Sequence, residues 1–347
     1  MDDKRPNRRS PEQAHRRASA RAARRAGLGM AIGAAVVAAA SLAIAQTSAA
    51  LPETLSAEGR AAVAAYNKQP PPPTDTPSRR AFFDRFEADI GAQQQRRYTV
   101  DITPSTLAGV PVRLIRAKGP PAPGNRVLIN LHGGGFQVDT GSVTENVPLA
   151  AITRIPVVAV LYRLSPEHTF PSAVDDSLAV YRELLKTHKP SEIGIYGTSA
   201  GADLGPQLIV RIRRERLPEP AVLGVFSGDA DLSKTSDSLA SSTLDIARLY
   251  RAYAGATPLT DPSISPALGP VDFFPPTLCM SSSRDFLLSS TANFCRKLEL
   301  SGVENKLVVF DGLPHGFWCF LDTPESDQAF AIMAKFLTAH LASPRRP

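Results

Sequence analysis

Residues 193–214 read IGIYGTSAGADLGPQLIVRIRR and join two structural patterns through one tight turn. Residues 193–196 form a short apolar run that suits a strand buried on both faces, and residues 200–214 have helical spacing. The turn between them is GTSAG at residues 197–201, with Ser199 at its centre. A serine between two glycines at a strand-to-helix turn is typical of a nucleophile elbow, which exposes the serine hydroxyl at the edge of a sheet.

The same alternation of strand and helix continues along the chain from residue 98. Short apolar or alternating runs predict strands at 98–103, 110–117, 127–131, 157–161, 193–196, 222–226, 277–281 and 306–310. Helical stretches lie near 172–187, 200–214, 289–301 and 326–341. The alternation predicts an α/β fold with a doubly wound, mostly parallel sheet. In such sheets ligands bind beyond the carboxyl ends of the strands, so the residues after each run are the candidates for a site.

Two segments outside this alternation have helical patterns of their own. Residues 51–97 predict two helices separated by a proline-rich break, and the second helix carries Phe82, Phe83 and Phe86 on one face. That face is expected to join the core, with a wall of an acyl pocket as the alternative. Residues near 228–275 are the longest interval without a clear strand. We expect both segments to contribute cap helices over the site.

The charge of the chain is concentrated in its first 25 residues. They hold nine basic and three acidic residues, which accounts for the whole formal net charge of +6 of the 347-residue chain. The remainder is therefore balanced and has no basic stripe interleaved with aromatic residues. Nothing in it favours a nucleic-acid partner.

An apolar, alanine-rich run at about 27–45 follows the basic residues and ends in a small-x-small pattern at 43–46. This arrangement predicts that residues 1–50 are a leader, either a cleaved signal peptide or, less favoured, an uncleaved membrane anchor. We therefore expect an exported protein, periplasmic or secreted, whose only route to a membrane is a retained anchor.

The three cysteines, Cys279, Cys295 and Cys319, are widely spaced and odd in number. They do not have the Cys-x-x-Cys spacing of a zinc site, and they do not form a dense disulfide framework. We expect them to pack in the core, although one disulfide among them is left open for an exported protein.

A glycine-rich turn, HGGGF at residues 132–136, comes directly after the predicted strand 127–131. Glycine amides have no Cβ in front of them and can point into a site that stabilises an oxyanion. We expect the amide of Ala200 to supply one donor and two of the three glycines Gly133, Gly134 and Gly135 to supply the others, with the pair left open. A phosphate-binding loop is disfavoured, because no Lys-Ser/Thr pair follows the glycines.

A serine hydroxyl needs a base to remove its proton, and the base needs a carboxylate to orient it. His315 is the predicted base, since it follows the strand at 306–310 in a late loop. Asp285 follows the strand at 277–281 and is the predicted carboxylate. Asp311 is its competitor, because it lies closer to His315 in sequence.

Together these features resemble the hormone-sensitive-lipase-like (bacterial family IV) esterases. The resemblance covers about residues 80–341 and rests on six motifs in order: HGGGF at 132–136, YRLSPEH at 162–168, FPSAVDD at 170–176, GTSAG at 197–201, DPSISP at 261–266 and HGF at 315–317. It implies an α/β-hydrolase fold with a helical cap, whose hydrolase domain spans 98–347. It also implies a bacterial enzyme that hydrolyses short-chain acyl esters without a metal or cofactor.

The sequence departs from the family pattern at two positions. Ala202 stands where the family often has a further glycine, and Ser289 stands where a second carboxylate commonly follows the triad aspartate. Neither residue belongs to the predicted proton-transfer chain. Arg163, Glu167 and Asp176 are expected to form ion pairs that hold the loops under the site.

The resulting hypothesis is a serine carboxylester hydrolase acting on a small-molecule ester, with Ser199, His315 and Asp285 as its triad. A lactone hydrolase using the same residues is the first alternative. A non-catalytic ligand-binding protein on the same scaffold is the second, and the presence of His315 argues against it. The sequence leaves open whether the chain forms a homodimer.

Overall fold

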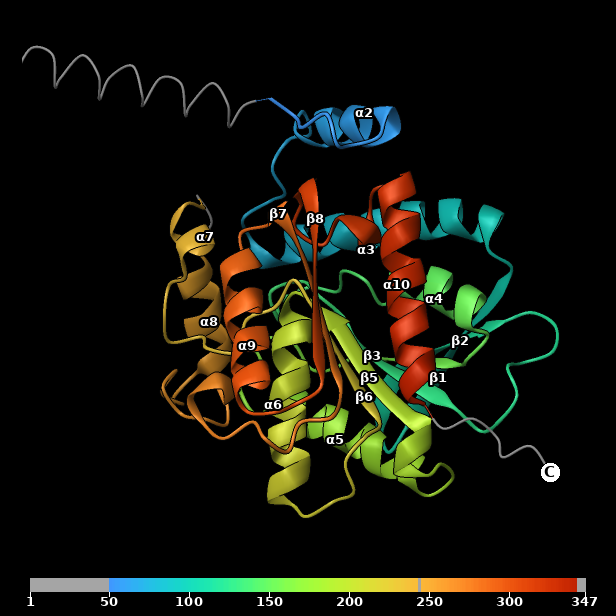
Figure 1. Ribbon diagram of the computed structural model, residues 1–347, viewed down its shortest axis with the longest axis vertical. Helices are drawn as coiled ribbons and strands as arrows, with labels where there is room; N and C mark the ends of the chain where they lie inside the picture. Colours follow the sequence, from blue (N-terminus) through green and yellow to red (C-terminus); the bar gives the residue numbers. More distant parts are fainter. Residues whose placement is uncertain (1–49, 243–244, 342–347) are drawn as a thin grey trace, which may run out of the picture. The chain divides into compact units, whose positions relative to one another are not determined.

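A sheet of eight strands lies at the centre of the fold (Figure 1). The computed structural model describes residues 50–242 and 245–341, and the residues from Glu53 onward form one compact unit. The predicted leader, residues 1–50, lies outside the described residues except for Ala50. No helix within the described ranges has the length and apolar character that a membrane crossing requires.

The strand order in the sheet is β1-β2-β4-β3-β5-β6-β7-β8. The strands are β1 (Val100–Leu107), β2 (Val110–Ala117), β3 (Val127–Leu131), β4 (Val157–Val160), β5 (Ile193–Thr198), β6 (Val222–Phe226), β7 (Thr277–Arg284) and β8 (Asn305–Pro314). The pairs β1–β2 and β2–β4 are antiparallel, and all other neighbours are parallel. The predicted doubly wound, mostly parallel sheet is confirmed.

Four strands extend beyond their predicted ends, β5 by two residues to Thr198 and β1, β7 and β8 by three or four. β7 and β8 continue to residues 284 and 314, where Ser282 pairs with Phe310 and Arg284 with Pro314. β1 runs to residue 107 and turns into β2 through Ala108 and Gly109, both with positive φ. The sequence pattern missed these extensions because strand pairing uses backbone groups and does not require apolar side chains.

The helices are α2 (Ala57–Tyr66), α3 (Thr76–Arg97), α4 (Asn146–Thr153), α5 (Ser172–Leu185), α6 (Ala200–Arg214), α7 (Asp237–Ala240), α8 (Ile246–Ala254), α9 (Leu288–Leu300) and α10 (Pro324–His340). The described part of the chain also has short 3₁₀ turns at Pro190–Glu192, Pro266–Leu268 and Phe317–Cys319. The prediction missed α4, whose eight residues NVPLAAIT are too short and too uniformly apolar to show a helical period.

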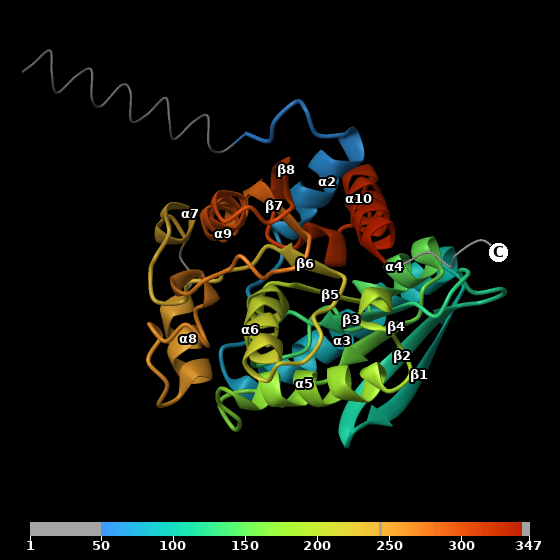
Figure 2. The same ribbon diagram turned by 60° about the horizontal axis from the view of Figure 1, so that its bottom comes forward.

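Helices cover both faces of the sheet. α4 and α10 pack against each other on one face, and α5 and α6 pack against each other on the opposite face (Figure 2). The strands β3, β4, β5 and β6 are buried along their whole length, as strands covered on both faces must be. This burial explains why their sequences are continuous apolar runs.

The segment before β1 is tied to the C-terminal part of the chain. The carboxylate of Glu325, in the first turn of α10, accepts from the amide of Ser56 at 2.7 Å and so holds the start of α2. At the end of α3, Arg97 forms an ion pair with Asp327 at 2.6 Å. The phenylalanines of α3 contact one another, and the ring of Phe86 lies 6.3 Å from that of Phe320.

Candidate active site

The turn between β5 and α6 holds Ser199 in a strained conformation. Ser199 has φ +58° and ψ −125°, a backbone region that residues with a side chain seldom occupy. The flanking glycines are required by space, because a Cβ on Gly197 or Gly201 would lie 2.4 Å or 1.7 Å from the carbonyl oxygen of Leu131. The turn therefore lifts Ser199 to the carboxyl edge of the sheet, directly at the N-terminus of α6.

The glycine turn after β3 has one amide engaged and two amides free. The N–H of Gly133 donates to the carbonyl of Thr140 at 3.0 Å. The amides of Gly134 and Gly135 donate to no acceptor within the described part of the chain, and neither does that of Ala200. Gly134 has φ +112°, and a Cβ there would lie 2.1 Å from the carbonyl oxygen of Val138. Of the three predicted glycine donors, Gly133 thus already uses its amide in a hydrogen bond within the protein.

His315 and Asp285 are in direct contact. His315 Nδ1 lies 2.6 Å from Asp285 Oδ1, although the two residues come from the loops after different strands. Asp285 is 2% exposed and also accepts from the Ser281 hydroxyl at 2.6 Å and the Leu287 amide at 2.8 Å. Burial raises the pKa of Asp285, but the adjacent imidazole and the hydrogen bonds outweigh it, so the pKa is lowered overall. This carboxyl is held in its charged form beside the histidine.

The competing carboxylate, Asp311, has other partners than His315. It is exposed, and its two oxygens accept from the hydroxyls of Thr54 at 2.6 Å and Ser283 at 2.9 Å. These hydrogen bonds, that of Thr54 first, lower the pKa of Asp311. Between the two candidates, Asp285 is the one that reaches His315.

The loops that carry Ser199 and His315 meet next to each other. A Cβ on Gly316 would lie 3.2 Å from Cγ2 of Thr198, so the residue after His315 contacts the residue before Ser199. Ser199 Oγ makes no hydrogen bond with the imidazole among the described contacts. Catalytic hydrogen bonds often shorten only when substrate is bound. The ring of Phe286 stacks on that of His315, with 4.1 Å between their centroids.

The sequence interpretation missed Glu145, a fully buried carboxyl group just before α4. Its Oε1 accepts from the hydroxyl of Thr198 at 2.6 Å, and its Oε2 accepts from Nδ2 of Asn130 at 2.9 Å. Burial raises the pKa of Glu145 to about 8, with a smaller contribution from the nearby Glu87. The only sequence signal was an acidic residue at the start of an apolar stretch, which predicts nothing about its distant partners.

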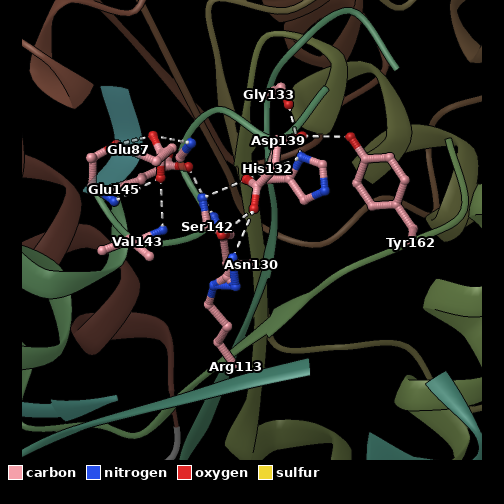
Figure 3. A network of polar contacts seen from close by, with 12 residues as sticks. Glu87, Arg113, Asn130, His132, Gly133, Asp139, Ser142, Val143, Glu145 and Tyr162 are labelled. Atoms are coloured by element: carbon pink, nitrogen blue, oxygen red, sulfur yellow. Dashed lines mark hydrogen bonds and ion pairs between the residues drawn. The ribbon is translucent and has the colours of Figure 1, made fainter. Parts of the chain in front are cut away.

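A second buried carboxyl group, Glu87, reaches the same region from α3. Its oxygens accept from the amides of Gly141 at 2.8 Å and Val143 at 3.1 Å, and from the Thr144 hydroxyl at 2.8 Å. Burial raises the pKa of Glu87 to about 7, and the charge of Asp139 adds to this rise. Figure 3 shows Glu87, Val143 and Glu145 gathered on one side of the loop that follows the glycine turn.

His132, the first residue of the glycine turn, has a structural role. Its buried ring stacks on Tyr162 at 4.1 Å, and its carbonyl accepts from the Tyr162 hydroxyl at 2.7 Å. The ring also lies 3.6 Å from Asp139, as the view in Figure 3 illustrates. These contacts fix the position from which the glycine turn leaves β3.

The predicted ion pairs under the site are present with one change of partner. Arg163 pairs with Asp176 at 2.8 Å, as expected. Glu167 pairs instead with Arg80 of α3, also at 2.8 Å, and that arginine lowers the pKa of Glu167 to about 2. The sequence could not show this partner, because Arg80 lies 87 positions away.

All three cysteines are buried free thiols. No group of three or more histidine, cysteine, aspartate or glutamate side chains in the described ranges is arranged to hold a metal ion.

Comparison with known proteins gives consistent matches. Residues 128–319 match a family model described as the alpha/beta hydrolase fold. An esterase from Acinetobacter venetianus is 34% identical over 258 residues, which is 70% of this chain and 83% of the relative. An ethyl acetate hydrolase from Pseudomonas putida is 29% identical and is matched over 76% of this chain and 90% of its own length.

Solved structures agree with the sequence relatives. The crystal structure of one esterase superposes with a TM-score of 0.74 at 29% identity, covering 84% of this chain and 96% of the other. The structure of an esterase from the bacterial hormone-sensitive lipase family gives a TM-score of 0.73 at 26% identity, over 83% of this chain and 99% of the other.

Proposed function

Because this chain belongs to the hormone-sensitive-lipase-like esterases of the α/β-hydrolase superfamily and is a carboxylesterase, we propose that Ser199, His315 and Asp285 are its catalytic triad. The observation that carries the proposal is the 2.6 Å contact between His315 Nδ1 and Asp285 Oδ1. That contact leaves Nε2 of His315 as the imidazole nitrogen available to a hydroxyl group. The contact between Thr198 and Gly316 supports a position of Ser199 close to this imidazole.

In the proposed reaction, the Ser199 hydroxyl attacks the carbonyl carbon of an ester while His315 takes the hydroxyl proton. The imidazolium formed is stabilised by the charged Asp285, whose lowered pKa suits that role. His315 then gives the proton to the leaving alcohol as the ester C–O bond breaks. Water, deprotonated by the same imidazole, then attacks the acyl carbon. The bond between the acyl carbon and Ser199 Oγ breaks, and His315 returns the proton to Ser199 as the acid leaves.

The proposed oxyanion donors are the amides of Gly134, Gly135 and Ala200. Gly133 is left out of this set because its amide already donates to Thr140. The three remaining amides have no protein acceptor among residues 50–242 and 245–341. The Ala200 amide also lies at the N-terminus of α6, where the helix dipole favours negative charge.

We further propose that α2, α3, α7 and α8 form a cap and that the substrates are short-chain acyl esters. Leu249 of α8 supports this, because its Cδ1 would lie 3.1 Å from a Cβ on Gly135. Phe286 covers one face of the His315 ring. Apolar side chains so close to the reacting groups leave little room for a long acyl chain. The relative named ethyl acetate hydrolase favours the same size.

The test is hydrolysis of p-nitrophenyl acetate, butyrate, octanoate and laurate by the purified protein and by Ser199→Ala. We expect activity to fall with acyl length and to be lost in Ser199→Ala by about 10⁴-fold or more. Ser105→Ala, on β1, is the matched control and should behave as the wild type. Equal rates for Ser199→Ala and the wild type would refute the assignment of the nucleophile.

The same preparation separates the two alternatives. A lactone hydrolase would turn over five- and six-membered lactones faster than the linear esters. A ligand-binding protein would hydrolyse neither, and a fluorophosphonate probe would not label Ser199.

A further inference from the structure

Thr198 lies where the three loops of the proposed site meet. It is the residue before Ser199, and its methyl group faces Gly316, the residue after His315. Its carbonyl oxygen would lie 3.0 Å from a Cβ on Gly133, the first glycine of the turn after β3. Thr198 therefore adjoins all three parts of the proposed site: Ser199, the His315 loop and the glycine turn.

The hydroxyl of Thr198 is the middle of a buried hydrogen-bonded chain. Trp318 Nε1 donates to Thr198 Oγ1 at 3.0 Å, and Thr198 Oγ1 donates to Glu145 Oε1 at 2.6 Å. An indole N–H can only donate, which fixes the direction of the hydrogen bond between Trp318 and Thr198. Trp318 comes three residues after His315, and the chain thus links two loops that are 120 positions apart.

Both ends of this chain are themselves held in place. The second oxygen of Glu145 accepts from Asn130 of β3, a strand in the middle of the sheet. The ring of Trp318 packs edge-to-face on Phe317 at 4.9 Å and on Phe226 of β6 at 6.2 Å. Thr198 is 4% exposed, Trp318 1% and Glu145 0%, so water does not compete for these hydrogen bonds.

We propose that Glu145 is a positioning residue which, through Thr198 and Trp318, holds the Ser199 turn and the His315 loop at the separation that proton transfer requires. The inference rests on the proposed function of Ser199 and His315. Glu145 touches neither substrate nor the reacting atoms. It acts through the hydrogen-bonded chain: without the Thr198 hydroxyl, the Trp318 N–H loses its acceptor and Glu145 Oε1 loses its donor. Displacing a catalytic group by about 1 Å can cost on the order of 100-fold in rate.

The main experiment compares Thr198→Val with Thr198→Ser. Valine keeps the shape of threonine and removes the hydroxyl, whereas serine keeps the hydroxyl. We expect Thr198→Val to lower kcat by about 10- to 100-fold while KM changes by less than about threefold, and Thr198→Ser to restore kcat to within about threefold of the wild type.

Thr277→Val is the matched control. Thr277 is also a fully buried threonine with one hydroxyl hydrogen bond, to the Pro275 carbonyl at 2.7 Å, but it lies at the opposite end of its strand from the site. It should lose stability without losing kcat. If Thr198→Val kept its kcat, or if Thr277→Val lost as much kcat as Thr198→Val, the proposal would be overturned.

Trp318→Phe gives a second route to the same chain if Thr198→Val folds poorly. It keeps an aromatic ring and removes the N–H, and we expect kcat to fall by about tenfold. The kcat of the double variant Thr198→Val/Trp318→Phe should be little lower than that of Thr198→Val alone, because both changes break the same hydrogen-bonded chain. Additive losses would contradict a shared role.

The rate of labelling by a fluorophosphonate separates this proposal from the one it rests on. Labelling needs Ser199 activated by His315, so its rate should fall in Thr198→Val in parallel with kcat. A wild-type protein that neither labels nor hydrolyses esters would refute the triad itself. A wild type that does both, with Thr198→Val unchanged in both, would refute only the role of Glu145.

Discussion

Asp285 and Glu145 are two buried carboxyl groups in similar surroundings, and their pKa values move in opposite directions. Asp285 is 2% exposed and Glu145 is 0% exposed. Each accepts from one hydroxyl at 2.6 Å, Ser281 for Asp285 and Thr198 for Glu145. The pKa of Asp285 is nevertheless lowered, whereas that of Glu145 is raised to about 8.

The difference comes from one partner. Asp285 faces the imidazole of His315, which can carry a positive charge, and Glu145 faces only the neutral groups of Thr198 and Asn130 with another carboxyl, Glu87, nearby. Burial alone favours the neutral acid in both cases. In this protein a buried carboxyl group beside an imidazole therefore favours its charged form, and one among neutral donors favours its neutral form.

The strongest way to break this contrast is Asp285→Asn, which puts a neutral amide beside His315. We expect kcat/KM to fall by about 10³- to 10⁴-fold, because the amide no longer holds the required tautomer or stabilises the imidazolium. Steady-state rates on p-nitrophenyl butyrate measure the loss.

Asp311→Asn is the matched control for that change. Asp311 is exposed and pairs with Thr54 and Ser283, so its loss should change kcat/KM by less than about twofold. A large loss in Asp311→Asn together with a small loss in Asp285→Asn would reverse the assignment of the two aspartates.

A smaller effect is expected from Glu87→Ala, which tests whether a buried carboxyl group among neutral donors holds a loop in place. The change leaves the amides of Gly141 and Val143 and the Thr144 hydroxyl without their acceptor. We expect the free energy of unfolding in urea to drop by about 2–4 kcal/mol. Glu87→Gln retains one acceptor oxygen and should cost about half as much. Equal stabilities of Glu87→Ala and Glu87→Gln would argue against this role.

The smallest effect concerns the pH dependence of stability. Raised pKa values mean that Glu87 and Glu145 favour the folded state most at low pH, and that this contribution is lost as pH rises from their ordinary value of 4.5 towards about 7 and about 8. Asp285 has a lowered pKa and acts in the opposite sense, since its contribution is lost as pH falls below its ordinary value of 3.8.

Glu145→Gln isolates the first of these contributions. Glutamine cannot ionise, so the decline in the free energy of unfolding between about pH 5 and pH 8 should become shallower by on the order of 1–3 kcal/mol. Urea titrations at four pH values would measure it. A decline as steep as that of the wild type would show that Glu145 has the same charge in both states.

The sequence predicted the parts of this molecule that depend on local order. The turn around Ser199 and the strand pattern could be found because a few adjacent residues specify each of them. Asp285 was preferred to Asp311 by the order of strands and loops, and the contact with His315 agrees with that preference. The fold was predictable for the same reason, since each buried strand is a short apolar run.

The sequence could not show the contacts between distant loops. Glu145 is separated from Thr198 by 53 positions, and Glu87 from Gly141 by 54. Neither of these separations in sequence belongs to a helical or strand repeat, so no sequence pattern predicts the contact. The hydrogen bond from the Gly133 amide to Thr140 likewise depends on how the loop folds back on itself, so the sequence does not distinguish the three glycines.

The contacts of Ser56 with Glu325 and of Arg97 with Asp327 have a consequence for how the chain is made. The residues in these two pairs lie 269 and 230 positions apart, so α10 must be synthesised before either contact can form. A nascent chain that has already completed Ser199 still lacks the carboxylates of Glu325 and Asp327. Glu87 can bind residues 141–144 earlier, so the middle of α3 can dock before its C-terminal end and the start of α2 are fixed.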